Sequence, residues 1–123
     1  MSLWKWKEVE LEVDMFDVGF QEKYEKAFEK MGITEKELQL TGTLTDFSKN
    51  YCRMFFRLFD DIFGEGTSDK LFHGKMNIRE VEDCYDSFLE CCKKETEYYL
   101  KRLQREQRNI RQSLRSNAYE FVL

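Results

Sequence analysis

The sequence predicts a mainly α-helical protein with a short N-terminal β-strand and a long C-terminal helix. The chain of 123 residues contains no proline, so long helices can run without a forced break. Hydrophobic residues make up 41% of the chain and include 11 phenylalanines, which is enough large apolar surface for one core. Charged residues reach 36%, a fraction typical of chains with long exposed helices.

The N-terminal stretch 3–13 alternates polar and apolar residues, which is the period of a half-buried strand. The period slips near Glu8, because the tryptophans before it stand at even positions and the aliphatic residues after it at odd ones. We interpret the slip as a bulge or a strand end. A single strand needs a partner for its backbone groups, and no second strand is obvious. The partner is therefore either the same strand of another subunit or a strand that the sequence hides.

Two helices are expected next. Asp17 is suited to be the N-cap of the first helix, and Gly32 is predicted to end it. Residues 34–37, Thr-Glu-Lys-Glu, have the pattern of a capping box that opens the second helix. Gly42 leaves open whether this second helix is split in two. Its apolar stripe consists of Leu38, Leu44, Phe47, Tyr51, Met54, Phe55, Leu58 and Ile62.

The aromatic side chains of the second helix are denser than one helix face requires. Phe56 and Phe63 lie well away from the centre of the face that Tyr51, Phe55 and Phe59 share. Burial on two sides indicates either a central helix or an oligomer interface, and we count Phe56 among the candidate interface residues.

The C-terminal half contains one long uninterrupted helical pattern. Residues 64–67, Gly-Glu-Gly-Thr, end the second helix and open a short turn at 68–72, which Gly74 closes. Asn77 begins another capping pattern, and no residue from 78 to about 116 breaks a helix. Such a helix is about 58 Å long, whereas a globule of this chain length is only about 35–40 Å across. Its second half must project, turn back or pack on another chain.

The apolar pattern of this helix favours projection. Residues 78–92 carry enough apolar side chains to dock on a body, whereas residues 93–117 are mostly Lys, Glu, Gln and Arg. A narrow seam with alternating steps of four and three continues there, as in a coiled coil. It consists of Thr96, Leu100, Leu103, Gln107, Ile110 and Leu114. The sequence thus predicts one domain with a helical body at 1–92 and a projecting arm at 93–123, and an interface at Leu100, Leu103, Gln107, Ile110 and Leu114.

The charge distribution narrows the class of partner. The net charge is −4, but residues 93–123 carry 8 basic and 4 acidic groups. An acidic chain disfavours nucleic-acid binding, and the asymmetry between body and arm favours contacts between copies, hence a homo-oligomer. No stretch approaches the roughly 18 apolar residues of a membrane span, so no membrane partner is expected. The N-terminus does not resemble a signal peptide, and reduced cysteines in the cytoplasm are the simplest expectation for the thiols.

No set of residues indicates catalysis, so we predict a protein that is not an enzyme and uses no cofactor and no metal. The single histidine, His73, has no nucleophile near it in sequence. Cys84, Cys91 and Cys92 lack the Cys-x2–4-Cys spacing of zinc sites. The segment 64–67 lacks the Gly-Lys-Ser/Thr ending of a phosphate loop, and Glu65 repels anions. The remaining candidates, Asp60, Asp61, Glu82, Asp83 and Asp86, are interpreted as helical surface charge.

Three segments carry a family resemblance: residues 16–27, residues 59–77 (FDDIFGEGTSDKLFHGKMN) and Tyr85-Asp86-Ser87-Phe88. Across roughly residues 10–90 the chain resembles small proteins encoded near tail genes in phages and prophages of Gram-positive bacteria. Several of these proteins are assigned as tail assembly chaperones. The resemblance implies a non-catalytic role in the cytoplasm of the bacterial host, keeping the helical tape-measure protein soluble until tail-tube subunits replace the chaperone. The alternatives are a structural subunit of a phage particle, an oligomeric helical scaffold, or a regulator that binds a host protein.

Overall fold

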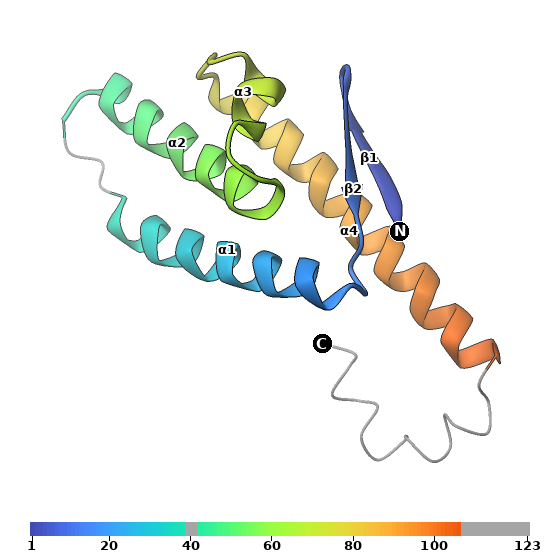
Figure 1. Cartoon of the computed structure of the whole chain (residues 1–123). Coiled ribbons are helices and arrows are strands. Elements are labelled where there is room, and N and C mark those ends of the chain that lie inside the picture. The colour runs from blue at the N-terminus through green and yellow to red at the C-terminus, as the bar shows by residue number, and fades with distance from the viewer. Residues whose placement is uncertain (39–41, 107–123) are drawn as a thin grey trace.

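The computed structural model describes residues 1–38 and 42–106. These residues form a hairpin of β1 (Ser2–Trp6) and β2 (Val9–Val13). The hairpin is followed by the helices α1 (Val18–Glu37), α2 (Leu44–Phe63), α3 (Thr67–Phe72) and α4 (Ile78–Glu106). Figure 1 shows α1 and α2 side by side, with α4 crossing behind the hairpin and continuing past it. The predicted fold class, mainly helical with a long C-terminal helix, is confirmed.

The predicted single strand is in fact two strands. β1 and β2 pair antiparallel, with Ser2 opposite Val13 and Trp6 opposite Val9. The connecting turn has only two residues, Lys7 and Glu8. Across such a turn every even position pairs with an odd one. The slip in the apolar period therefore marks the end of β1, one of the two predicted alternatives, and not a bulge. The strand that the sequence hid is the second half of the same stretch.

The hairpin turn is tied to the start of α4. Lys7 has a φ of 53°, a left-handed conformation that glycine usually takes in tight turns. Its amine pairs with Glu80, whose other oxygen lies 3.6 Å from the amine of Lys75. The hydrogen bond from Lys7 and the two nearby positive charges lower the pKa of the Glu80 carboxyl.

Trp4 joins the hairpin to two helices. Its side chain is buried, with 2% of the residue exposed. The indole stacks on Phe59 at 5.6 Å and on Phe63 at 5.9 Å, and lies 5.2 Å from the ring of Phe88. Its Nε1 donates a hydrogen bond to the hydroxyl of Ser87 at 3.0 Å. The indole therefore makes aromatic contacts with α2 and α4 and satisfies its one polar group.

The first helix begins as predicted but ends later. The carboxylate of Asp17 accepts the Phe20 N–H at 2.9 Å and caps α1. The prediction that Gly32 ends the helix is wrong, and so is the capping box at 34–37, because α1 continues to Glu37. One glycine inside a helix costs only about 1 kcal/mol, which burial of Ala27 and Met31 in the preceding turns outweighs.

The second helix therefore starts later than the sequence pattern predicts. Thr43 and Asp46 form the capping box of α2, and Gly42, with a φ of 90°, precedes it. Leu44, predicted in the core, is 79% exposed. The buried part of the predicted stripe starts further along, and its members are Met54, Phe55, Leu58 and Ile62.

The dense aromatic face of α2 reflects a central helix. Phe63 contacts Trp4, Phe20 and Phe88, and Phe56 stacks on Phe72 of α3 at 5.1 Å. α2 is thus packed on more than one side by its own chain, as a central helix must be.

Replacing Trp4 with alanine tests the central role of the indole. We expect Trp4→Ala to lower the free energy of unfolding by about 3–5 kcal/mol, because it leaves a large cavity between three elements. Leu3→Ala is the matched control, since the side chain of Leu3 is 60% exposed, and it should change stability by less than about 0.5 kcal/mol. Urea denaturation measures both, and equal losses would contradict the assignment.

Candidate functional site

The first candidate site is the end of α4, where the helix leaves the body. Its inward face is buried from Val81 to Glu95. One turn further, Tyr99 stacks on Phe16 at 4.5 Å. Residues 101–106 are all exposed. The body therefore holds α4 as far as Tyr99, about two helical turns beyond the predicted boundary at residue 92.

A buried carboxylate fixes this part of α4 to both ends of the hairpin. Glu95 is 6% exposed, and one of its oxygens lies 3.0 Å from the amino group of Met1. The other oxygen accepts the backbone N–H of Met15 at 3.0 Å. The hydrogen bond to Glu95 raises the pKa of the Met1 amino group. A buried charge requires such partners, so Glu95 anchors the helix rather than lying in a solvated arm.

The predicted interface residues are only partly within the described chain. Leu103 is 40% exposed and Leu100 is partly buried. Gln107, Ile110 and Leu114 lie outside the described residues. Thr96, the first seam position, uses its hydroxyl to donate to the carbonyl of Cys92 at 2.8 Å.

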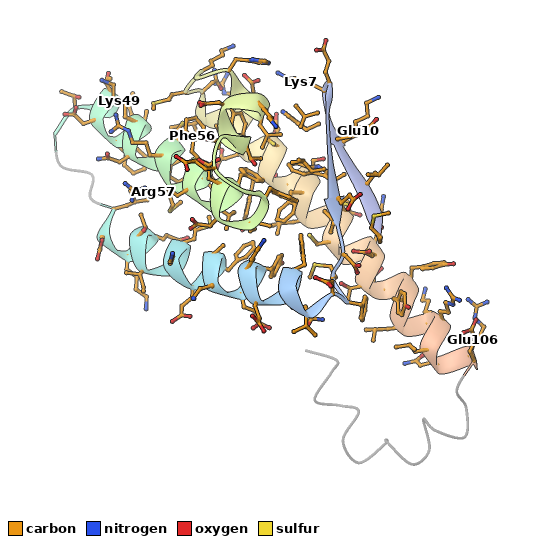
Figure 2. The ribbon with its side chains drawn as sticks, in the orientation of Figure 1. Lys7, Glu10, Lys49, Phe56, Arg57 and Glu106 are labelled. Atoms are coloured by element: carbon orange, nitrogen blue, oxygen red, sulfur yellow. The ribbon has the colours of Figure 1, made fainter. Side chains whose placement is uncertain are left out.

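Phe56 does not join this seam. It stacks on Phe72 within the chain and remains partly exposed. Figure 2 shows it on α2, well away from Glu106 at the described end of α4. The structure therefore brings Leu100 and Leu103 together on one helix and separates Phe56 from them.

The second candidate site is a groove of about 650 Å³ between β1 and α4. Its β1 wall consists of residues 1–5, and its other wall is the side of α4 from Ser87 to Arg102. Met1, Leu3 and Tyr98 border it with exposed apolar side chains. Sequence reasoning missed this groove because it depends on where the hairpin docks.

Cys52, Cys84 and Cys92 are core residues, and Cys91 packs against the core while remaining partly exposed. Burial raises the pKa of the Cys84 and Cys92 thiols to about 12, and it also raises the pKa of Cys52 and Cys91. A thiol must lose its proton to act as a nucleophile or metal ligand, so this environment opposes both roles. In the described ranges 1–38 and 42–106, no cluster of three or more His, Cys, Asp or Glu side chains is arranged to hold a metal ion.

The other chemically interesting residues have structural partners or lie open to solvent. The carboxylate of Asp60 accepts the N–H of Ser68 at 2.7 Å and its hydroxyl at 3.0 Å. The Asp60 carboxylate therefore occupies the donors at the start of α3, which a phosphate-binding turn would use to hold an anion. His73 is exposed and ends α3 in a left-handed conformation, with a φ of 51°. Glu82 accepts a hydrogen bond from the Tyr51 hydroxyl at 2.9 Å.

These observations define a mainly helical protein with an N-terminal hairpin and with two candidate sites, the end of α4 and the groove beside β1. None of the described helices combines the length and apolar character of a membrane-spanning helix. The chain belongs to DUF6673, a family of unknown function whose sequence profile matches residues 7–117. The match begins after β1 and continues beyond the described end of α4. Comparisons with curated proteins and with solved structures gave no match.

The thiol environments predict a stepwise reaction with a disulfide reagent. In the native protein only Cys91, the one partly exposed cysteine, should react in a first, faster phase, which the raised pKa of its thiol keeps slower than the reaction of a free cysteine. All 4 cysteines should react in guanidinium chloride. The absorbance of the coloured thiolate that the reagent releases measures the number of cysteines that react in the native and in the denatured protein. Cys91→Ser should remove the fast reaction. Two or more fast thiols in the native protein would contradict the burial of Cys52, Cys84 and Cys92.

Proposed function

We propose that this chain is a non-catalytic assembly chaperone or adaptor of a phage or prophage tail, acting in the cytoplasm of the bacterial host. Its partner would be a long helical protein of the tape-measure type. The observation that supports this proposal is that α4 extends past its last aromatic contact with the body, at Tyr99, and exposes Leu103.

A helix with a narrow apolar seam suits a helical partner. Leu100 and Leu103 stand three residues apart, so they lie on neighbouring turns of one face. The same spacing continues in sequence at Gln107, Ile110 and Leu114. A seam of this width is too narrow for a globular core but wide enough to pair two helices. A tape-measure helix presents apolar stripes that must be covered by another protein until assembly.

The charge distribution supports the alternative of a structural subunit of the phage particle or an oligomeric helical scaffold. Residues 93–123 are basic, with 8 positive and 4 negative groups, whereas the whole chain has a net charge of −4. Arms of one copy would therefore be attracted to bodies of another. The two functions differ in one outcome: a structural subunit remains in the mature particle, and a chaperone does not.

Substituting Leu103 tests the seam in isolation. We expect Leu103→Lys to lower the molar mass measured by light scattering at several concentrations, because a charge in an a/d seam disfavours helix pairing. Leu44→Lys is the matched control, since Leu44 is 79% exposed on a different helix. A Leu103→Lys protein that assembles like the unmodified chain would show that the seam does not mediate self-association.

Co-expression tests the proposed partner. A tape-measure fragment with exposed apolar stripes should become soluble and co-purify with this chain, and also with Leu44→Lys. Recovery with Leu103→Lys should fall about tenfold, the equivalent of 1.4 kcal/mol of lost binding. Absence of co-purification and of any gain in solubility would rule out the chaperone proposal.

A further inference from the structure

We propose that the groove beside β1 binds an extended, acidic segment of a partner protein, which adds a strand to the free edge of β1. This surface is separate from the α4 seam, and the inference goes beyond the proposed function. It rests on the backbone of β1, on the apolar rim of the groove and on its charge.

The backbone of β1 has a free edge. The pair next to the two-residue turn, Trp6 and Val9, is hydrogen-bonded, and such pairs alternate along an antiparallel ladder. The N–H and C=O groups of Leu3 and Lys5 therefore point away from β2. In the part of the chain that the structure describes, these groups have no hydrogen-bond partner outside the hairpin. An exposed row of strand donors and acceptors is a template for another strand.

The groove runs along this free edge. All five residues from Met1 to Lys5 line it. Alternate side chains of a strand point to opposite faces of the sheet, so consecutive residues can all line one groove only along the edge of the strand. The opposite wall is α4, and the volume of about 650 Å³ gives room for side chains of an added strand.

Apolar side chains gather at the rim. Of the eight large hydrophobic residues that are exposed in the described ranges, three line this one groove. They are Met1, Leu3 and Tyr98, with exposed fractions of 65%, 60% and 63%. Single exposed apolar residues are ordinary, but a group around an open strand edge favours binding of another chain.

The charge of the groove selects an acidic occupant. Lys5, Lys94 and Arg102 line it, against two carboxylates, Glu90 and Glu95. The second carboxylate, Glu95, is engaged with the amino group of Met1.

The cations of α4 are only weakly engaged within the chain. Lys94 lies 3.8 Å from Glu90 and Arg102 lies 3.2 Å from Glu106, and all four side chains are at least 50% exposed. Exposed pairs of this kind contribute little, so both cations remain available to a partner. Pairing of two β1 edges would instead bring two basic grooves together, which disfavours a second copy of the chain as the occupant.

A synthetic peptide tests the inference directly. The probe is an eight-residue peptide in which glutamate alternates with valine, blocked at both ends. One control replaces glutamate with lysine, and a second carries N-methyl groups on alternate backbone nitrogens, which removes the donors of one edge. Amide chemical shifts of the labelled full chain, followed by titration, locate the site and measure affinity. We expect shifts at Leu3 and Lys5, and affinity for the glutamate peptide at least ~10-fold above that for either control.

Charge reversal in the protein provides the complementary test. Lys94→Glu with Arg102→Glu should weaken binding of the glutamate peptide about tenfold. The matched control is Lys49→Glu with Arg57→Glu, because both residues are exposed on α2, away from the described end of α4 (Figure 2). Circular dichroism and urea denaturation check that both double variants are folded.

Several results would overturn the inference. They are no binding of the glutamate peptide, equal binding of the lysine peptide, or equal effects of the two double variants. Amide shifts at Leu3 and Lys5 that grow with protein concentration in the absence of peptide would identify a second copy as the occupant and also refute the inference. Leu103→Lys should bind the glutamate peptide as well as the unmodified chain does, so failure of the seam and failure of the groove are distinguishable.

Discussion

The position of the Trp4 indole between α2 and α4 is the contact on which the other features depend. A two-stranded hairpin is marginally stable in water by itself, so β1 and β2 need a body to rest on. Trp4 provides this by stacking on Phe59 and Phe63 and by contacting Phe88. With the indole in place, the free edge of β1 lies beside α4 and the groove between them exists. The ion pairs of Lys7 with Glu80 and of the Met1 amino group with Glu95 add to this attachment.

Glu95 sets how far the body extends along α4. A carboxylate that is only 6% exposed needs charged or hydrogen-bonding partners, and it finds them in the Met1 amino group and the Met15 N–H. These two groups flank the hairpin, so one side chain holds both of its ends. The stacking of Phe16 on Tyr99 follows within one helical turn. Beyond this point the residues from 101 to 106 are all exposed, and the helix presents Leu103 to its surroundings.

Local patterns in the sequence predicted the helical class, the Asp17 cap and the long α4, because each depends on neighbouring residues. The helix α3 was predicted only as a short turn at 68–72. Features that depend on distant residues were not predictable. Gly32 lies inside α1 because burial of Ala27 and Met31 outweighs one glycine. Glu95 was assigned to a polar arm, although it stands seven residues after Phe88 and shares its helix stripe. The slip in the apolar period near Glu8 did mark the position of the hairpin turn. The sequence pattern is the same for a turn and for a bulge, and only the pairing of the two strands distinguishes them.

The two candidate surfaces lie on different sides of the same helix. Leu103 and Lys94 are nine residues apart, and at about 100° per residue this places them on opposite sides of α4. A helical partner on the Leu103 side therefore does not compete for space with an extended segment beside β1. A scaffold that repeats a single contact has no need of a second, chemically different surface. The adaptor that we propose would need both surfaces, one for a helical partner and one for an extended partner.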